Sequence, residues 1–157
     1  MRIVRALGIA VVAAAVFAAV VPGRASAQGL SPTSVYFRGP GGNVVCGYFA
    51  GAGLPAFLEC GVPTGLDPPA PAPSAGSCHG LDPAGDRVRL HSTGGVFGFC
   101  SGDIGVLGEF GSAPALAYGK DWHEGPFTCI TSVAWVTCKN PSGHGFALSR
   151  LHWHPVR

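Results

Sequence analysis

Residues 127–138 read FTCITSVAWVTC, and this stretch decides the fold. Cys129 and Cys138 enclose eight residues, with a midpoint between Val133 and Ala134. The stretch predicts a β-hairpin with strands over residues 127–131 and 134–138. Directly opposed residues of an antiparallel pair have Cα atoms about 4.5–5.5 Å apart, which is within disulfide range. The hairpin could therefore carry its own bridge, Cys129–Cys138.

The other four cysteines are placed in a similar way. Cys46 and Cys60 lie in candidate strands over 44–50 and 56–60, on either side of a turn centred on Gly53. Cys78 and Cys100 flank a longer segment, in which strands over 87–91 and 96–100 form a second predicted hairpin. Six cysteines allow 15 pairings. The spacing favours the neighbour pairs Cys46–Cys60, Cys78–Cys100 and Cys129–Cys138 without excluding the others.

Glycine and proline interrupt the rest of the chain, and they favour short strands over helices. The 157 residues include 25 Gly and 14 Pro, and no stretch keeps a helical period over three turns. Further strands are expected over 35–38, 115–118 and 145–152, whereas the proline-rich residues 62–77 are expected to form a loop. The predicted fold class is mostly β: a small antiparallel β domain of disulfide-stapled hairpins with little helix.

The first 27 residues have the pattern of a cleavable signal peptide. Arg2 and Arg5 precede an uncharged apolar run over 6–21, and Ala25-Ser26-Ala27 fits the small-x-small cleavage rule. Cleavage near Ala27–Gln28 would leave residues 28–157 as a single domain, secreted or held at the cell envelope. A leader retained as an anchor is the alternative. With the leader removed, we expect no stable membrane insertion.

Charge and cysteine usage exclude several function classes. The leader carries three of the ten basic residues and none of the eight acidic ones, so the mature chain has a formal charge of −1. A near-neutral domain lacks the basic footprint for nucleic acid. An even cysteine count in an exported chain is typical of structural disulfides and argues against a reactive thiol.

The C-terminal part carries a recognisable combination of residues. After Cys129 and Cys138 come Asn140, Gly-His-Gly-Phe at 143–146 and Leu-Ser-Arg at 148–150. Weaker matches precede them at Phe37, Pro40, Gly42-Asn43, Cys46, Cys60, Cys78, Cys100, Gly102-Asp103 and Ala117-Tyr118-Gly119. Over roughly residues 35–150 the chain resembles an actinobacterial family of small secreted proteins that carry a domain of unknown function. That family usually has a tryptophan soon after its third cysteine, where this chain has His79-Gly80. The resemblance implies a secreted domain of unassigned activity.

Two chemical hypotheses arise from the histidines. His144, flanked by glycines, could act as a general base with Ser149 as nucleophile and Asp103 as orienting carboxylate, as in a small secreted hydrolase. His144 could instead join His152 and His154 in a C-terminal zinc site, because imidazole is a common zinc ligand. No nucleophile-elbow motif supports the first hypothesis, and no carboxylate at a recognised spacing supports the second. We therefore assign no catalytic residue, metal or cofactor.

A binding function is the leading interpretation. Tyr118 and Trp122 lie in a segment that mixes aromatic and polar residues, as surfaces for carbohydrate or peptide do. His144 is a further candidate, and Arg150 could hold an anionic group with two hydrogen bonds. The alternatives are a local turn for His144, a structural ion pair with Asp103 for Arg150, and simple core packing for the aromatic residues. The partner would be an envelope polysaccharide or protein.

Overall fold

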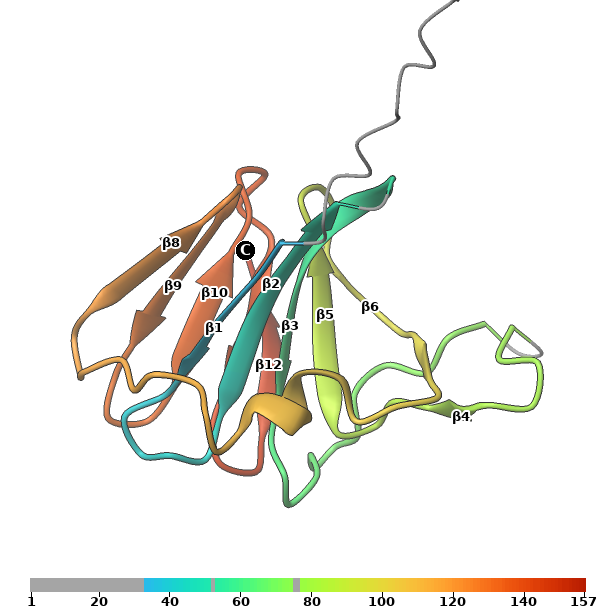
Figure 1. The fold of residues 1–157 in the computed structure, drawn as a ribbon, viewed down its shortest axis with the longest axis horizontal. Coiled ribbons are helices and arrows are strands. Elements are labelled where there is room, and N and C mark those ends of the chain that lie inside the picture. Colours follow the sequence, from blue (N-terminus) through green and yellow to red (C-terminus); the bar gives the residue numbers. More distant parts are fainter. Residues whose placement is uncertain (1–32, 52, 75–76) are drawn as a thin grey trace, which may run out of the picture.

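The protein is a β-sandwich of two five-stranded antiparallel sheets (Figure 1). A computed structural model describes residues 33–51, 53–74 and 77–157, so the predicted leader lies outside the described residues. The first sheet has the order β1 (Thr33–Arg38), β2 (Val45–Gly51), β3 (Leu54–Gly61), β5 (Arg87–His91) and β6 (Val96–Phe97). The second has the order β12 (Trp153–Val156), β11 (Gly145–Leu148), β10 (Val136–Lys139), β9 (Phe127–Thr131) and β8 (Asp121–Glu124).

Two smaller elements complete the fold. A two-stranded pair, β4 (Asp82–Pro83) and β7 (Cys100–Ser101), lies to one side of the sandwich, at the right of Figure 1. The 3-10 helix η1 (Gly105–Glu109) packs on β2 and β3. The prediction of a mostly β, antiparallel fold with little helix is confirmed.

Alternation along the strands explains how the core forms. On β9, Phe127, Cys129 and Thr131 are buried while Thr128 and Ile130 are exposed, as expected for a strand with one face on a core. The main apolar cluster draws on both sheets, with Phe37, Cys46, Leu58, Cys60, Val88, Leu90, Phe127, Cys129, Val136, Cys138, Phe146 and Leu148 among its members. The two inner faces therefore share one core.

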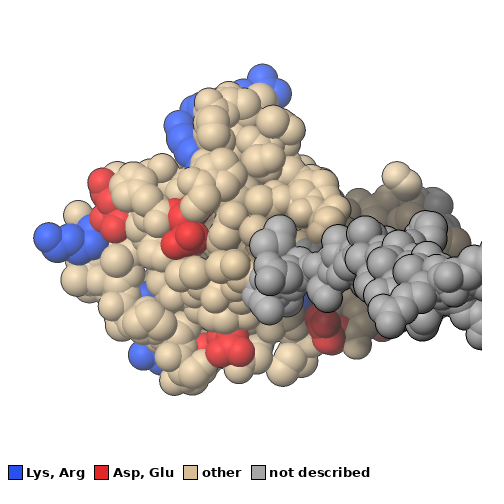
Figure 2. Space-filling model, turned by 45° about the horizontal axis from the view of Figure 1, so that its top comes forward, with Lys and Arg blue, Asp and Glu red and all other residues tan. Residues whose placement is uncertain are grey.

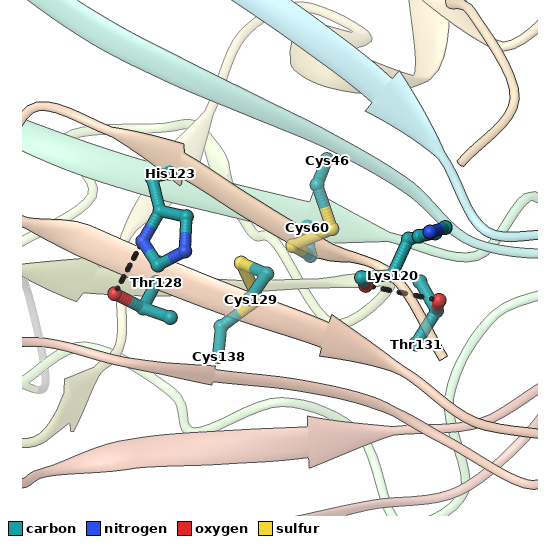
Figure 3. The surroundings of a disulfide bond; sticks show 8 residues. All are labelled: Cys46, Cys60, Lys120, His123, Thr128, Cys129, Thr131 and Cys138. Atoms are coloured by element: carbon teal, nitrogen blue, oxygen red, sulfur yellow. Dashed lines mark hydrogen bonds between the residues drawn. A yellow bond between two sulfur atoms is a disulfide. The ribbon is translucent and has the colours of Figure 1, made fainter. Parts of the chain in front are cut away.

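The three disulfides join neighbouring cysteines, Cys46–Cys60, Cys78–Cys100 and Cys129–Cys138. In the first and third pairs the cysteines are directly opposed on adjacent strands, with Cα atoms 4.1 and 4.0 Å apart. Figure 3 shows these two bridges side by side in the core. The sulfur atoms of Cys46, Cys60 and Cys138 all lie within 4.8 Å of one another. The bridges thus contact each other across the interface between the sheets.

The second bridge does not staple a hairpin, and this expectation was wrong. Cys100 lies on β7, which pairs with β4 and not with β5, and Cys78 lies in a turn before β4. A Cβ atom on Gly98 would lie 2.4 Å from the carbonyl oxygen of Pro71. The chain therefore leaves the sheet after β6 because it packs closely on the proline-rich segment.

Two predicted strands also differ from the observed ones. Residues 115–118 form only an isolated bridge between Arg38 and Ala115. The expected strand over 145–152 is two strands, β11 and β12, separated by a turn in which the Ser149 side chain accepts a hydrogen bond from the backbone N–H of His152 at 3.0 Å. Serine at such a position favours a turn because its hydroxyl substitutes for a backbone partner.

The strand directions determine which turns lie at each end of the sandwich. β1, β9 and β11 all run toward one end, drawn at the bottom of Figure 1, where the turns over 39–44, 132–135 and 149–152 lie. The first described residue of β1, Thr33, and the last residue of β12, Val156, lie at the opposite end. In the described part of the chain no helix combines the length and apolar character needed to cross a membrane.

Candidate functional site

A small pocket opens between the turns at the lower end of the sandwich. Its volume is about 90 Å³. It is lined by the β1–β2 turn, the loop before β8, the β9–β10 turn and the β11–β12 turn. The side chains that give it chemical character are Asn43, Tyr118, Trp135 and Arg150. We call it the turn pocket.

Glycine and proline build the part of the β1–β2 turn that forms one wall of the pocket. The Gly39 N–H donates to the Val44 carbonyl at 2.9 Å, and the Gly42 N–H donates to the Gly39 carbonyl at the same distance. Gly42 has a φ of 70°, a conformation that glycine adopts without steric cost. The Asn43 amide donates to the Gly41 carbonyl at 3.0 Å. These bonds fix the turn that carries Asn43 to the pocket.

Local hydrogen bonds also hold the two aromatic residues. The backbone on either side of Tyr118 is tied to Thr131, whose hydroxyl donates to the Ala117 carbonyl at 2.6 Å. Trp135 closes the β9–β10 turn, where its N–H donates to the Ser132 hydroxyl at 3.0 Å. The Trp135 ring also meets His154 edge to face, with centroids 4.9 Å apart. Tyr118 is 53% exposed, so its ring is available to a ligand.

Arg150 gives the pocket its charge. Among the described residues, no acidic side chain lines the pocket, and Arg150 takes part in no ion pair. The structural pairing with Asp103 considered from the sequence is absent from the described contacts, because Asp103 lies beside Arg87 instead, at 3.8 Å. Ser149 also lines the pocket, but its hydroxyl is engaged within its own turn.

The structure brings together two of the four binding residues expected from the sequence. Tyr118 and Arg150 line the turn pocket, although they are 32 positions apart in the chain. Trp122 packs in the core, with its ring centroid 4.7 Å from that of Phe37, because its position on β8 faces the inner side of the sheet. His144 precedes β11 at the opposite end of the sandwich, where its Nδ1 lies 3.1 Å from the Ser142 hydroxyl.

The residues of the hydrolase hypothesis are far apart. His144 and Ser149 flank β11 at its two ends, and a strand rise of about 3.3 Å per residue places them roughly 16 Å apart. The Asp103 carboxylate accepts a hydrogen bond from the Gly105 N–H at 2.9 Å, outside the first sheet. A proton relay requires hydrogen-bond contact. These three side chains do not form one.

The histidines of the zinc hypothesis are also dispersed. His154 is paired with Ala147, three positions along β11 from His144, or roughly 10 Å. His152 uses its Nδ1 in the turn, 2.6 Å from the Asp67 carbonyl oxygen. Zinc would need all three nitrogens about 2.0–2.1 Å from one point. The sulfur cluster of Cys46, Cys60 and Cys138 is no substitute, because thiolates bind metals and these sulfurs are bridged.

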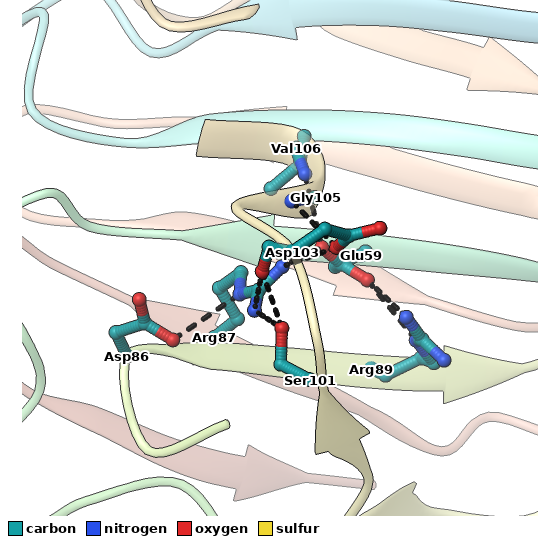
Figure 4. Close-up of polar contacts among 8 residues, drawn as sticks. All are labelled: Glu59, Asp86, Arg87, Arg89, Ser101, Asp103, Gly105 and Val106. Atoms are coloured by element: carbon teal, nitrogen blue, oxygen red, sulfur yellow. Dashed lines mark hydrogen bonds and ion pairs between the residues drawn. The ribbon is translucent and has the colours of Figure 1, made fainter. Parts of the chain in front are cut away.

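A buried polar network that no sequence motif indicated lies on the outer face of the first sheet (Figure 4). The Glu59 carboxylate on β3 accepts a hydrogen bond from the Arg87 guanidinium at 3.2 Å and one from the Val106 N–H at 3.0 Å. It also forms an ion pair with Arg89. Glu59 and Arg87 are 1% and 2% exposed. Gly105, with a φ of 48°, lets η1 approach, since a Cβ there would lie on the Arg87 guanidinium. The network fastens η1 to the sheet, and its two central side chains, Glu59 and Arg87, are buried.

His91 sits beside this network on β5. Its ring stacks on Phe97 with centroids 4.0 Å apart, and its Nδ1 is buried without a hydrogen-bond partner. Burial lowers the pKa of His91 below its usual value, and the positive charge of Arg89 lowers it further, while a backbone contact at Ala56 opposes both. The neutral form of the His91 ring is therefore favoured by its surroundings.

Charged residues elsewhere are scattered over the face shown in Figure 2, where Lys and Arg do not gather into one patch among the residues described.

Comparison of the chain with protein-family models, with curated proteins and with solved structures found no match.

Proposed function

We propose that this chain is a secreted, non-enzymatic binding module and that the turn pocket is its ligand site. The observation that carries the proposal is the convergence of Tyr118, Trp135 and Arg150 from three separate loops around one cavity. Loops positioned by a rigid scaffold are a common place for binding residues. The three disulfides supply that rigidity and suit an oxidising compartment outside the cytoplasm.

The size of the pocket limits the ligand. Its volume of about 90 Å³ is that of about three water molecules, well below the roughly 300–1,000 Å³ of a pocket for a drug-sized ligand. It therefore suits one end group or ring edge of a larger molecule. Aromatic walls with a few polar donors bind a sugar ring through its apolar face and its hydroxyls. We propose an envelope polysaccharide as the partner. We also propose that the chain belongs to the secreted actinobacterial family that its sequence resembles.

The test measures co-sedimentation of the oxidised, exported protein with protease-treated cell-wall polysaccharide. Tyr118→Ala and Trp135→Ala should each weaken binding by about threefold to tenfold, since an aromatic contact contributes about 0.5–1.5 kcal/mol. Ile130→Ala is the control, because Ile130 is 47% exposed on the outer face of β9 and outside the pocket.

Two results would contradict the proposal. Equal binding by the wild type and both aromatic variants would show that the turn pocket is not the site. Binding that requires untreated cell wall and disappears after proteolysis would identify a protein partner instead of a polysaccharide.

A further inference from the structure

We infer that the turn pocket selects a carboxylate-bearing sugar unit, such as a uronic acid, over a neutral sugar. This inference rests on the proposed function and specifies the chemistry of the ligand. Arg150 is the one charged residue among those described around the pocket, and its guanidinium has no ionic partner there. A guanidinium presents planar paired donors that match the two oxygens of a carboxylate.

The other walls fit the rest of such a ligand. Tyr118 and Trp135 line the same pocket as Arg150, and their rings offer apolar surface to the edge of a sugar ring. Asn43 contributes an amide whose oxygen makes no hydrogen bond among the described residues, so it can accept one from a sugar hydroxyl. A free small anion would use Arg150 alone, whereas a uronic acid would use the charge and the aromatic walls together.

The absence of nearby acidic groups decides the sign of the charge that the pocket accepts. The hydroxyls of Ser132 and Ser149 are both engaged with backbone groups of their own turns, so they do not change the balance. A carboxylate entering the pocket meets one cation and no acidic side chain among the described lining residues. An amino sugar with a positive charge would meet repulsion from Arg150 instead.

The experiment is a titration of the isotopically labelled, oxidised protein with D-glucuronate, D-glucose or acetate, followed by ¹H–¹⁵N chemical-shift mapping. Glucuronate should shift the amides of residues 39–44, 132–136 and 148–150 at concentrations at which glucose and acetate shift them far less. Arg150→Gln should weaken glucuronate binding by about tenfold or more, because a hydrogen bond to a charged group is lost. The affinity of Arg150→Lys for glucuronate should lie between those of the wild type and Arg150→Gln, since lysine keeps the charge and loses the paired donors.

Arg157→Gln is the matched control, because Arg157 is exposed at the end of the chain, away from the pocket. It should leave glucuronate binding unchanged. Equal affinity for glucose and glucuronate, or no effect of Arg150→Gln, would overturn the inference while leaving the proposed sugar-binding function intact. Acetate binding as strong as glucuronate binding would overturn it in favour of a simple anion site. If neither sugar perturbs the pocket, the proposed function fails together with the inference.

Discussion

Replacing Glu59 with glutamine removes the negative charge that holds two arginines and a backbone N–H on the outer face of the first sheet. Arg87 would keep Asp86, at 3.1 Å, and the Asp103 carbonyl, at 2.9 Å, but it would lose its buried ionic partner. Breaking a buried ion pair from one side costs about 3–5 kcal/mol when the remaining charge is left uncompensated, and the contacts that Arg87 keeps with Asp86 and Asp103 place the expected loss toward the lower end of this range. Both side chains are almost fully buried, so solvent screening does not reduce this figure.

The assay is equilibrium unfolding of the oxidised protein in guanidinium chloride, followed by tryptophan fluorescence. Glu59→Gln should lower the free energy of unfolding by about 3–5 kcal/mol, and Arg87→Met should lower it by a similar amount. The double variant Glu59→Leu with Arg87→Met should recover part of the loss, because the buried Glu59–Arg87 pair is then removed from both sides, while Arg89 and the Val106 N–H still lose their acceptor. A loss below about 1 kcal/mol for Glu59→Gln, or fully additive losses in the double variant, would refute the reasoning.

Three further predictions concern other parts of the fold. Gly105→Ala should destabilise the protein by more than 1 kcal/mol in the same assay, because its Cβ would collide with the Arg87 guanidinium at a φ of 48°. Replacing Cys129 and Cys138 together with alanine should lower the free energy of unfolding by about 2.7 kcal/mol, the entropy value for a ten-residue loop, and a smaller loss than about 1 kcal/mol would contradict that account. The pKa of His91 is lowered in the folded state, so the free energy of unfolding should fall as pH drops below about 6.5, while it should not change from this cause at higher pH. His91→Gln should flatten that slope in unfolding curves measured between about pH 5 and 8, and an unchanged slope would contradict the assignment.

The sequence predicts the two core hairpins well because their signals are local. Opposed cysteines around a turn constrain the register of both strands at once, and the observed pairs Cys46–Cys60 and Cys129–Cys138 lie directly opposite each other. The path of Cys100 depends instead on close packing between Gly98 and a segment more than 20 residues earlier, which no local pattern indicates. The break between β11 and β12 was missed for a different reason, because a local contact of one serine side chain makes the turn that separates the two strands.

The candidate site was partly predictable. Tyr118 and Arg150 could be selected as binding residues by type, but they line one pocket because the loops that carry them lie at the same end of the sandwich. Trp135 was not selected, because it lies between two cysteines of a predicted hairpin and no motif around it indicates a ligand site. Glu59 was overlooked because its partners lie 28 and 30 positions away, on β5. A single carboxylate between Leu58 and Cys60 gives no local sign of them.

The direction of β1 and β12 has a practical consequence. Both strands place their outer ends, Thr33 and Val156, opposite the turn pocket, and the six residues of β1 span about 20 Å. A protein attached to a sensor chip, a bead or a cell surface through either of these strand ends would present the pocket outward. The turn pocket would then stay accessible to the polysaccharide that we propose as its ligand.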